Sequence, residues 1–161
     1  MKIHAIAVGG TIDKIYFDAK SKYEVGEPAV SKMLLDLPIH IDVSVTPLMA
    51  KDSLEMTDED REKVRQAVLD TQCDKVLITH GTDTMPETAR ALADIKSKTV
   101  VLTGALEPAI FKDSDAQFNV GGALATLQSA QSGVYIVMNG EVFDALNVKK
   151  DRDLNRFLPL V

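Results

Sequence analysis

Hydroxyl and carboxylate side chains follow several apolar runs of this sequence, at the point where each run ends. They are Thr11 after Gly9-Gly10, Ser53 after Asp52, and Thr82 with Asp83 after His80-Gly81. A neutral hydroxyl is a weak nucleophile and needs a base or a strong hydrogen-bond acceptor beside it. The sequence shows neither a Ser-His-Asp arrangement nor a spacing of metal ligands. The chemistry that these residues support is therefore that of a hydroxyl assisted by a carboxylate.

The elements that would position these side chains alternate along the chain. Residues 2–8, 41–46, 75–79, 99–103 and 133–138 are apolar and β-prone, whereas residues 28–35, 57–71, 86–95 and 118–129 have the caps or apolar spacing of helices. Such alternation predicts one α/β domain over residues 1–161, a three-layer Rossmann or flavodoxin-like domain with a central, mostly parallel sheet and helices on both faces. Ligands bind beyond the carboxyl ends of the strands in such sheets.

Two long segments between these elements are polar and carry no clear pattern of helix or strand. They are residues 11–27 and 104–116. A loop of this size in a compact domain is often a lid or a binding loop. We therefore expect both segments to border a site.

Composition excludes several classes of partner. The net charge is −6, which disfavours binding to nucleic acid or to an anionic membrane. No apolar run approaches the about 20 residues of a membrane span. The N-terminal stretch MKIHAIAV leads directly into Gly9-Gly10 and predicts a first strand rather than a signal peptide. Cys73 is the only cysteine, so no intrachain disulfide can form, and we expect a cytoplasmic protein.

Two segments together resemble a known family. Gly9-Gly10-Thr11-Ile12 and residues 80–85 (HGTDTM) resemble the two signature segments of bacterial-type L-asparaginases. Further segments agree in order, namely residues 23–26 (YEVG), 52–53 (DS), 103–105 (TGA), 114–115 (SD) and 137–139 (VMN). The resemblance covers essentially the whole chain, but only the N-terminal domain of that family. It implies the asparaginase N-terminal fold and, without cofactor or metal, hydrolysis of L-asparagine to L-aspartate and ammonia through a threonine acyl-enzyme.

The resemblance also implies a role for individual residues. Thr11 would be the nucleophile, Tyr23 would hydrogen-bond it, and Thr82, Asp83 and Lys150 would form a proton relay. The backbone N–H groups of Gly10 and Thr82 are candidates for binding the oxyanion. Asp83 would bind the α-ammonium of the substrate and Ser53 its α-carboxylate. The residues expected to bind substrate are Gly10, Ser53, Gly81, Thr82, Asp83 and Ala105.

Plainer interpretations exist for each of these residues. Gly9-Gly10-Thr11 can be a Gly-Gly turn whose threonine caps a helix or helps to bind a phosphate. Thr82-Asp83 can be a turn that caps the helix at Pro86, and Ser53 can be a turn residue. Tyr23 can be an ordinary loop aromatic. Lys150 can be one of a solvated pair with Lys149, which also leaves the register of the relay lysine open. For His80 we expect a structural role.

The sequence departs from the family pattern beside the expected site. Leu54 stands where a polar residue usually follows the serine, and Leu106-Glu107 replaces a Met-Arg pair. The family's second domain, which lends residues to a neighbouring subunit's site, has no counterpart in this chain. We expect a homodimer or larger assembly. Two alternatives stay open: a non-catalytic amino-acid-binding or regulatory module, and a component of a tRNA-dependent amidotransferase.

Overall fold

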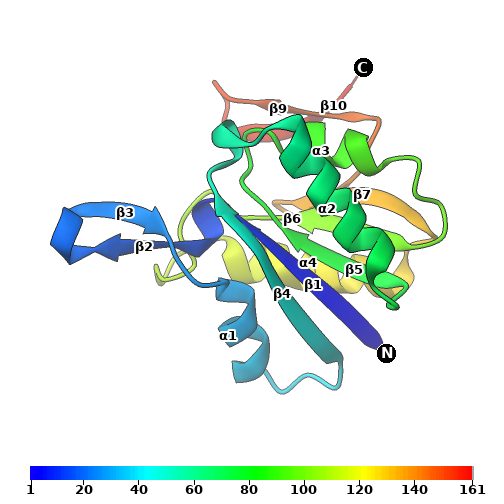
Figure 1. The fold of residues 1–161 in the computed structure, drawn as a ribbon, viewed down its shortest axis with the longest axis horizontal. Coiled ribbons are helices and arrows are strands. Elements are labelled where there is room, and N and C mark those ends of the chain that lie inside the picture. The colour runs from blue at the N-terminus through cyan, green and yellow to red at the C-terminus, as the bar shows by residue number, and fades with distance from the viewer. Residues whose placement is uncertain (161) are drawn as a thin grey trace.

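A six-stranded sheet forms the centre of the computed structural model, which describes residues 1–160. Its order is β4 (Asp42–Lys51), β1 (Lys2–Gly9), β5 (Lys75–Thr79), β6 (Thr99–Thr103), β7 (Gly133–Met138) and β8 (Glu141–Asp144) (Figure 1). The first five strands are parallel, and β8 pairs antiparallel with β7. The predicted mostly parallel sheet is confirmed.

Helices cover both faces of the sheet, as the predicted three layers require (Figure 1). The helices α2 (Asp58–Asp70) and α3 (Met85–Leu92) pack on one face, and α1 (Ala29–Asp36) and α4 (Ala116–Ser129) on the other. The central strand β5 shows how: Ile78 belongs to the core under α2 and α3, and its neighbour Leu77 to the core under α1 and α4. Successive strand residues point to opposite faces, so a run of buried apolar residues fills both cores.

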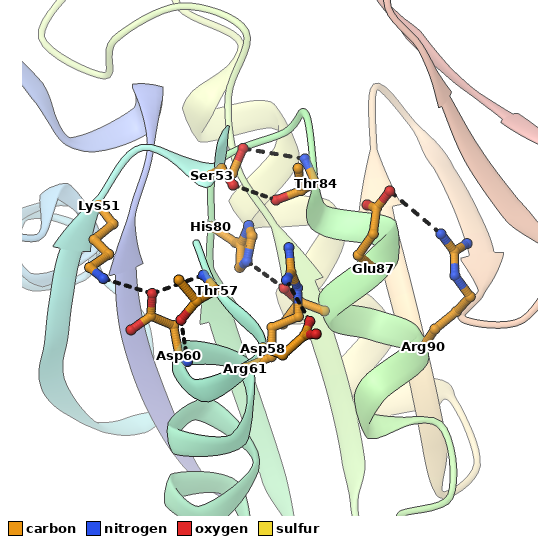
Figure 2. Close-up of polar contacts among 11 residues, drawn as sticks. Lys51, Ser53, Thr57, Asp58, Asp60, Arg61, His80, Thr84, Glu87 and Arg90 are labelled. Carbon is orange, nitrogen blue, oxygen red and sulfur yellow. Dashed lines mark hydrogen bonds and ion pairs between the residues drawn. The ribbon is translucent and has the colours of Figure 1, made fainter. Parts of the chain in front are cut away.

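The start of α2 follows the predicted capping box. The Thr57 hydroxyl accepts a hydrogen bond from the Asp60 N–H at 3.2 Å, and the Asp60 carboxylate accepts one from the Thr57 N–H at 3.0 Å (Figure 2). The same carboxylate binds the Lys51 ammonium at 2.7 Å, at the end of β4. The Asp60 carboxylate therefore connects the start of α2 to the end of β4, which is the strand that precedes Ser53.

The prediction that residues 11–27 contain no regular element was wrong. This segment forms a short 3₁₀ turn, η1 (Thr11–Asp13), and an antiparallel hairpin of β2 (Lys14–Phe17) and β3 (Lys22–Val25), joined by η2 (Asp18–Lys20). The hairpin projects away from the sheet (Figure 1). Its four-residue strands pair only with each other, so they lack the buried apolar face that marks a strand in a sequence.

A second short hairpin near the end of the chain also escaped the sequence analysis. It consists of β9 (Val148–Asp151) and β10 (Arg156–Pro159), which lie beside α3 (Figure 1). Residues 104–116, in contrast, carry neither helix nor strand before α4 begins, as predicted. Among residues 1–160, no helix is both long and apolar enough to cross a membrane.

The base of the first hairpin is closed by a buried aspartate at the end of η1. The Asp13 carbonyl accepts the Gly26 N–H at 2.8 Å, and its carboxyl Oδ1 accepts the Ala29 N–H, at the start of α1, at 2.8 Å. Burial raises the pKa of the Asp13 carboxyl from 3.8 to about 7, although the hydrogen bond from Ala29 opposes the rise. Asp13 therefore connects the two ends of the hairpin to each other and to α1.

The raised pKa of the Asp13 carboxyl predicts that the stability of the protein depends on pH. The variant Asp13→Asn should lack this dependence. The folded-state pKa lies above the unfolded one, so its contribution is complete below about pH 4 and is lost as the pH rises through 7. Urea unfolding should show that the free energy of unfolding of the wild type, relative to Asp13→Asn, falls by about 2–3 kcal/mol between pH 5 and 8. An unchanged difference across this range would contradict a buried, proton-binding Asp13.

Candidate functional site

Two glycines at the ends of neighbouring strands touch through their backbones. Gly10 has φ of 87°, and a Cβ placed on it would lie 2.3 Å from the nitrogen of Gly81. A Cβ on Gly81 would in turn lie 2.7 Å from the Cβ of Ser53. The ends of β1, β5 and β4 therefore meet at one point, and Thr11 and Thr82 are the residues that directly follow the touching glycines.

Thr11 begins the η1 turn and is half-buried. The N–H of Gly10 donates to the carbonyl of Lys51 at 2.9 Å, so the expectation that this group binds an oxyanion was wrong. It is already committed to β4, which pairs with β1 at this point. The N–H groups of Thr11 and Thr82 make no hydrogen bond within residues 1–160, so both can donate to a ligand.

Lys150 reaches Thr82 from the second hairpin. Its ammonium Nζ donates to the Thr82 hydroxyl at 3.0 Å, across 68 positions of sequence. The hairpin is fixed to α3 by Arg90, whose guanidinium donates to the carbonyl of Val148 at 3.2 Å. Lys149 is exposed and Lys150 half-buried, because adjacent residues of a strand point to opposite sides. The structure thus places Lys150, rather than Lys149, at Thr82.

Two carboxylates flank this ammonium group. Burial lowers the pKa of Lys150, and the negative charges of Asp83 and Asp115 oppose that effect, while the positive charge of Arg152 adds to it. The Asp83 side chain is half-buried and makes no hydrogen bond within residues 1–160, so it does not cap α3. Asp83 is therefore a carboxylate available to a ligand beside the Thr82–Lys150 pair.

Ser53 lies in the turn that links β4 to α2. It is 2% exposed, its hydroxyl accepts the Thr84 N–H at 3.3 Å, and its carbonyl accepts the Thr84 hydroxyl at 2.7 Å (Figure 2). The preceding Asp52 accepts the Leu54 N–H at 3.0 Å, as in an Asx turn. The turn role of Ser53 is therefore present, and its hydroxyl keeps a proton that it can donate.

His80 has the structural role that we expected. Its Nδ1 donates to the carbonyl of Gly81 at 2.6 Å, and its Nε2 lies 2.8 Å from the hydroxyl of Thr88 on α3. Complete burial lowers the pKa of His80 to about 4. The ring is consequently neutral at neutral pH and holds the Gly81 backbone in place.

Ala105 follows the end of β6 and is buried among apolar side chains. The preceding Gly104 approaches His80 so closely that a Cβ on it would lie 2.3 Å from the His80 carbonyl oxygen. The end of β6 thus joins those of β1, β4 and β5 at this edge of the sheet.

Tyr23 is not joined to Thr11 by a hydrogen bond in the described residues. It lies on β3 of the projecting hairpin, where the residue is 48% exposed and its ring contacts those of Tyr16 and Phe111, with centroids 5.4 and 5.9 Å away. The contact with Phe111 connects the hairpin to the 104–116 loop. Both long loops therefore meet through aromatic side chains, as loops bordering one site would.

Sequence reasoning missed two residues that support the site. Asp115 accepts the N–H groups of Leu106 and Glu107, each bond being 3.0–3.1 Å long, and so shapes the loop after β6. Asn155 accepts a hydrogen bond from Lys150 Nζ at 2.9 Å. The segment SD at residues 114–115 is distinctive only as part of the resemblance, and a lone asparagine in a charged stretch gives no signal.

Comparison with known proteins identifies this arrangement. The family model described as "Asparaginase, N-terminal" matches residues 2–156. L-asparaginase 2 of Escherichia coli is 36% identical over 160 residues, covering 92% of this chain and 46% of that protein. A component of the glutamyl-tRNA(Gln) amidotransferase of Thermoplasma acidophilum is 29% identical over 149 residues, covering 89% of this chain and 36% of that protein. The solved thermostable L-asparaginase from Thermococcus kodakarensis superposes with a TM-score of 0.87 at 25% identity, covering 99% of this chain and 51% of that one.

The glycine contact at the strand ends predicts a sharp contrast between two Gly→Ala variants. Gly10→Ala adds a Cβ that overlaps Gly81 at a positive φ, which should lower the free energy of unfolding by about 2–4 kcal/mol. Gly121→Ala adds a methyl group on α4 that, among the described residues, meets no heavy atom within 4 Å outside the backbone of its own helix, and it should be neutral or stabilising. Chemical denaturation of both variants checks this, and equal effects would mean that the contact is not tight.

Proposed function

We propose that this chain, which belongs to the asparaginase family through its match to that family's N-terminal domain, hydrolyses the side-chain amide of L-asparagine to L-aspartate and ammonia. The chain spans about half the length of the L-asparaginase that it matches, and a smaller share of the amidotransferase component. L-asparaginases are among its relatives and among the solved structures with the same fold. The reaction, its substrate and the residues that carry it are therefore proposals, which rest on these relatives together with the geometry of the site.

The observation that carries the proposal is the hydrogen bond between Lys150 and Thr82. It gives a half-buried hydroxyl a charged partner at 3.0 Å, with the Asp83 carboxylate beside them. Gly10 contacts Gly81, and Thr11 and Thr82 directly follow these glycines, which supports a site that contains both threonines. A nucleophilic hydroxyl and a proton-handling group close to it are the two components that acyl transfer requires.

The reaction would proceed in two steps. The Thr11 Oγ forms a bond to the amide carbon, and the N–H groups of Thr11 and Thr82 bind the negative oxygen. With Lys150 in its neutral form, the Thr11 proton passes through Thr82 to Lys150 and from there to the amide nitrogen. The carbon–nitrogen bond then breaks and the nitrogen leaves as ammonia. Water then cleaves the threonine ester, aspartate departs, and the proton returns to Thr11.

The two charged ends of the substrate would be held apart from the reacting amide. The carboxylate of Asp83 is suited to the α-ammonium, and the hydroxyl of Ser53 can donate to the α-carboxylate. Gly81 and Ala105 would form the close backbone walls. Leu54, which is 58% exposed, offers no hydrogen bond, and for this reason we expect a millimolar KM. We further predict that the active unit is a homo-oligomer and that the protein is cytoplasmic.

Replacement of the nucleophile gives the decisive test. Thr11→Ala should lower kcat for ammonia release from asparagine by at least about three decades, because it removes the hydroxyl that we propose forms the ester. Thr11→Ser keeps a hydroxyl and serves as the control, and both variants should melt close to the wild type. Substantial ammonia release by Thr11→Ala would show that the nucleophile is misassigned.

The same preparation separates hydrolysis from the two alternatives. Thermal stabilisation of the wild type by aspartate, without any ammonia release, would favour a binding module. Activity that appears only with a copurifying partner protein would favour an amidotransferase component, to which the relative from Thermoplasma acidophilum points. Ammonia release by the purified chain would contradict both.

The α-ammonium contact predicts the behaviour of Asp83→Asn. Loss of the charge should raise KM by about ten- to a hundredfold, the worth of one charge-assisted hydrogen bond, and should also lower kcat because the amide is then misplaced. Glu59→Gln, on the exposed side of α2, is the control for loss of one negative charge and should leave both constants unchanged. An unaltered KM in Asp83→Asn would remove Asp83 from the ammonium site.

A further inference from the structure

The Lys150 ammonium has a second fixed acceptor besides Thr82. Its Nζ donates to the amide Oδ1 of Asn155 at 2.9 Å as well as to the Thr82 hydroxyl at 3.0 Å. We propose that Asn155 is a positioning residue that holds the ammonium of Lys150 on Thr82 and sets the pH at which Lys150 works. The proposal rests on the proposed function in so far as it assigns Lys150 a part in the reaction.

The backbone of the hairpin presents the Asn155 amide to Lys150. Asn155 has φ of 48°, in the left-handed region that asparagine and glycine tolerate best. Its N–H donates to the carbonyl of Arg152 at 3.3 Å, and the Asp151 carboxylate accepts the Leu154 N–H at 2.9 Å, so the turn is closed by hydrogen bonds of its own. In this turn the Oδ1 of Asn155 lies within hydrogen-bonding distance of Lys150 on β9.

Phe157 limits the lysine from another side. It is the cross-strand partner of Lys150 in the hairpin, and the Lys150 ammonium lies 5.2 Å from the centre of its ring. An aromatic face attracts a cation but fixes no direction for its N–H bonds. The amide of Asn155 supplies that direction, because a carbonyl oxygen accepts along its lone pairs.

A neutral acceptor suits this position better than a charged one. Lysine is a flexible point charge, and Asp83 and Asp115 attract the Lys150 ammonium electrostatically. Without Asn155 the ammonium would have one fixed partner and could move toward either carboxylate. With a carboxylate in place of the amide it would be held in an ion pair in its charged form. The amide orients Lys150 without adding charge, and burial can then keep the pKa of Lys150 below its ordinary value.

Two variants separate these effects because both replacement residues tolerate the left-handed backbone. Asn155→Gly keeps the turn and removes the acceptor, which should lower the pKa of Lys150 and reduce the plateau of kcat at high pH about tenfold, with little change in KM. Asn155→Asp keeps the oxygen and adds a charge, which should raise the pKa of Lys150 and move the rising limb of the pH–kcat profile to higher pH. The matched control is Asn139→Gly in the β7–β8 turn, where Asn139 has φ of 51°.

The pKa of Lys150 can be followed without any turnover. In protein labelled with ¹³Cε-lysine, NMR titration of the Lys150 signal, assigned by its absence in Lys150→Arg, should give the order Asn155→Asp, then wild type, then Asn155→Gly from highest to lowest. The Asn139→Gly protein should titrate like the wild type. Identical titration of Lys150 in all of these proteins would overturn the inference, as would a kcat in Asn155→Gly no lower than in Asn139→Gly.

Failure of the proposed function would look different. If the wild type releases no ammonia, the catalytic part of the assignment falls, while the NMR titration still decides whether Asn155 governs the ionisation of Lys150. If the wild type is active and Lys150 titrates independently of Asn155, the function stands and the positioning role is wrong.

Discussion

The backbone contact between Gly10 and Gly81 is the constraint on which the rest of the structure depends. Parallel neighbours such as β1 and β5 end at the same edge of the sheet, but ordinary side chains would keep the segments that follow them apart. Because neither residue has a Cβ, the two backbone segments can approach to van der Waals distance. Gly104 repeats the arrangement against His80 at the end of β6. Three adjacent strands therefore bring the residues after them together without any ligand to hold them.

The charges at this edge come from distant parts of the chain. Lys150 enters from a hairpin 68 positions after Thr82, and the carboxylates of Asp83 and Asp115 come from the turns before α3 and α4. The half-buried Lys150 ammonium is poorly solvated, and the charges of these two carboxylates compensate for this in part. The site thus combines a rigid backbone centre with a side chain whose ionisation depends on several elements at once.

The fold could be predicted where buried residues give the sequence a periodic or continuous pattern of apolar side chains. The five parallel strands are apolar runs packed on both faces, and α2 begins at the capping box that Thr57 and Asp60 form. The hairpins 14–25 and 148–159 were missed because their strands have only four residues each. Such short strands show too little alternation of apolar and polar residues to be recognised in the sequence. The expected use of the Gly10 N–H was wrong because a hydrogen bond to Lys51 depends on strand order, which a sequence does not state.

The same reasoning explains the unequal outcome for the candidate site. Thr11, Ser53, Thr82 and Asp83 follow strands whose ends must converge, so their proximity follows from topology. Lys150 was placed by resemblance alone, and its partner Asn155 by nothing in the sequence. Asp13 is buried at the base of the hairpin, where its carboxyl accepts the Ala29 N–H of the distant helix α1, and no local pattern reveals this contact.

The closed base of the β2–β3 hairpin has a consequence for how this protein can change. Lys14 pairs with Val25, and the Gly26 N–H binds the Asp13 carbonyl, so the chain enters and leaves the hairpin at one point. The turn η2 at the tip of the hairpin can therefore be lengthened or shortened without shifting the register of β1 or the start of α1, since the cost of closing a longer loop grows only slowly. Evolution or engineering can therefore graft new surface onto this hairpin while the scaffold beneath it stays the same.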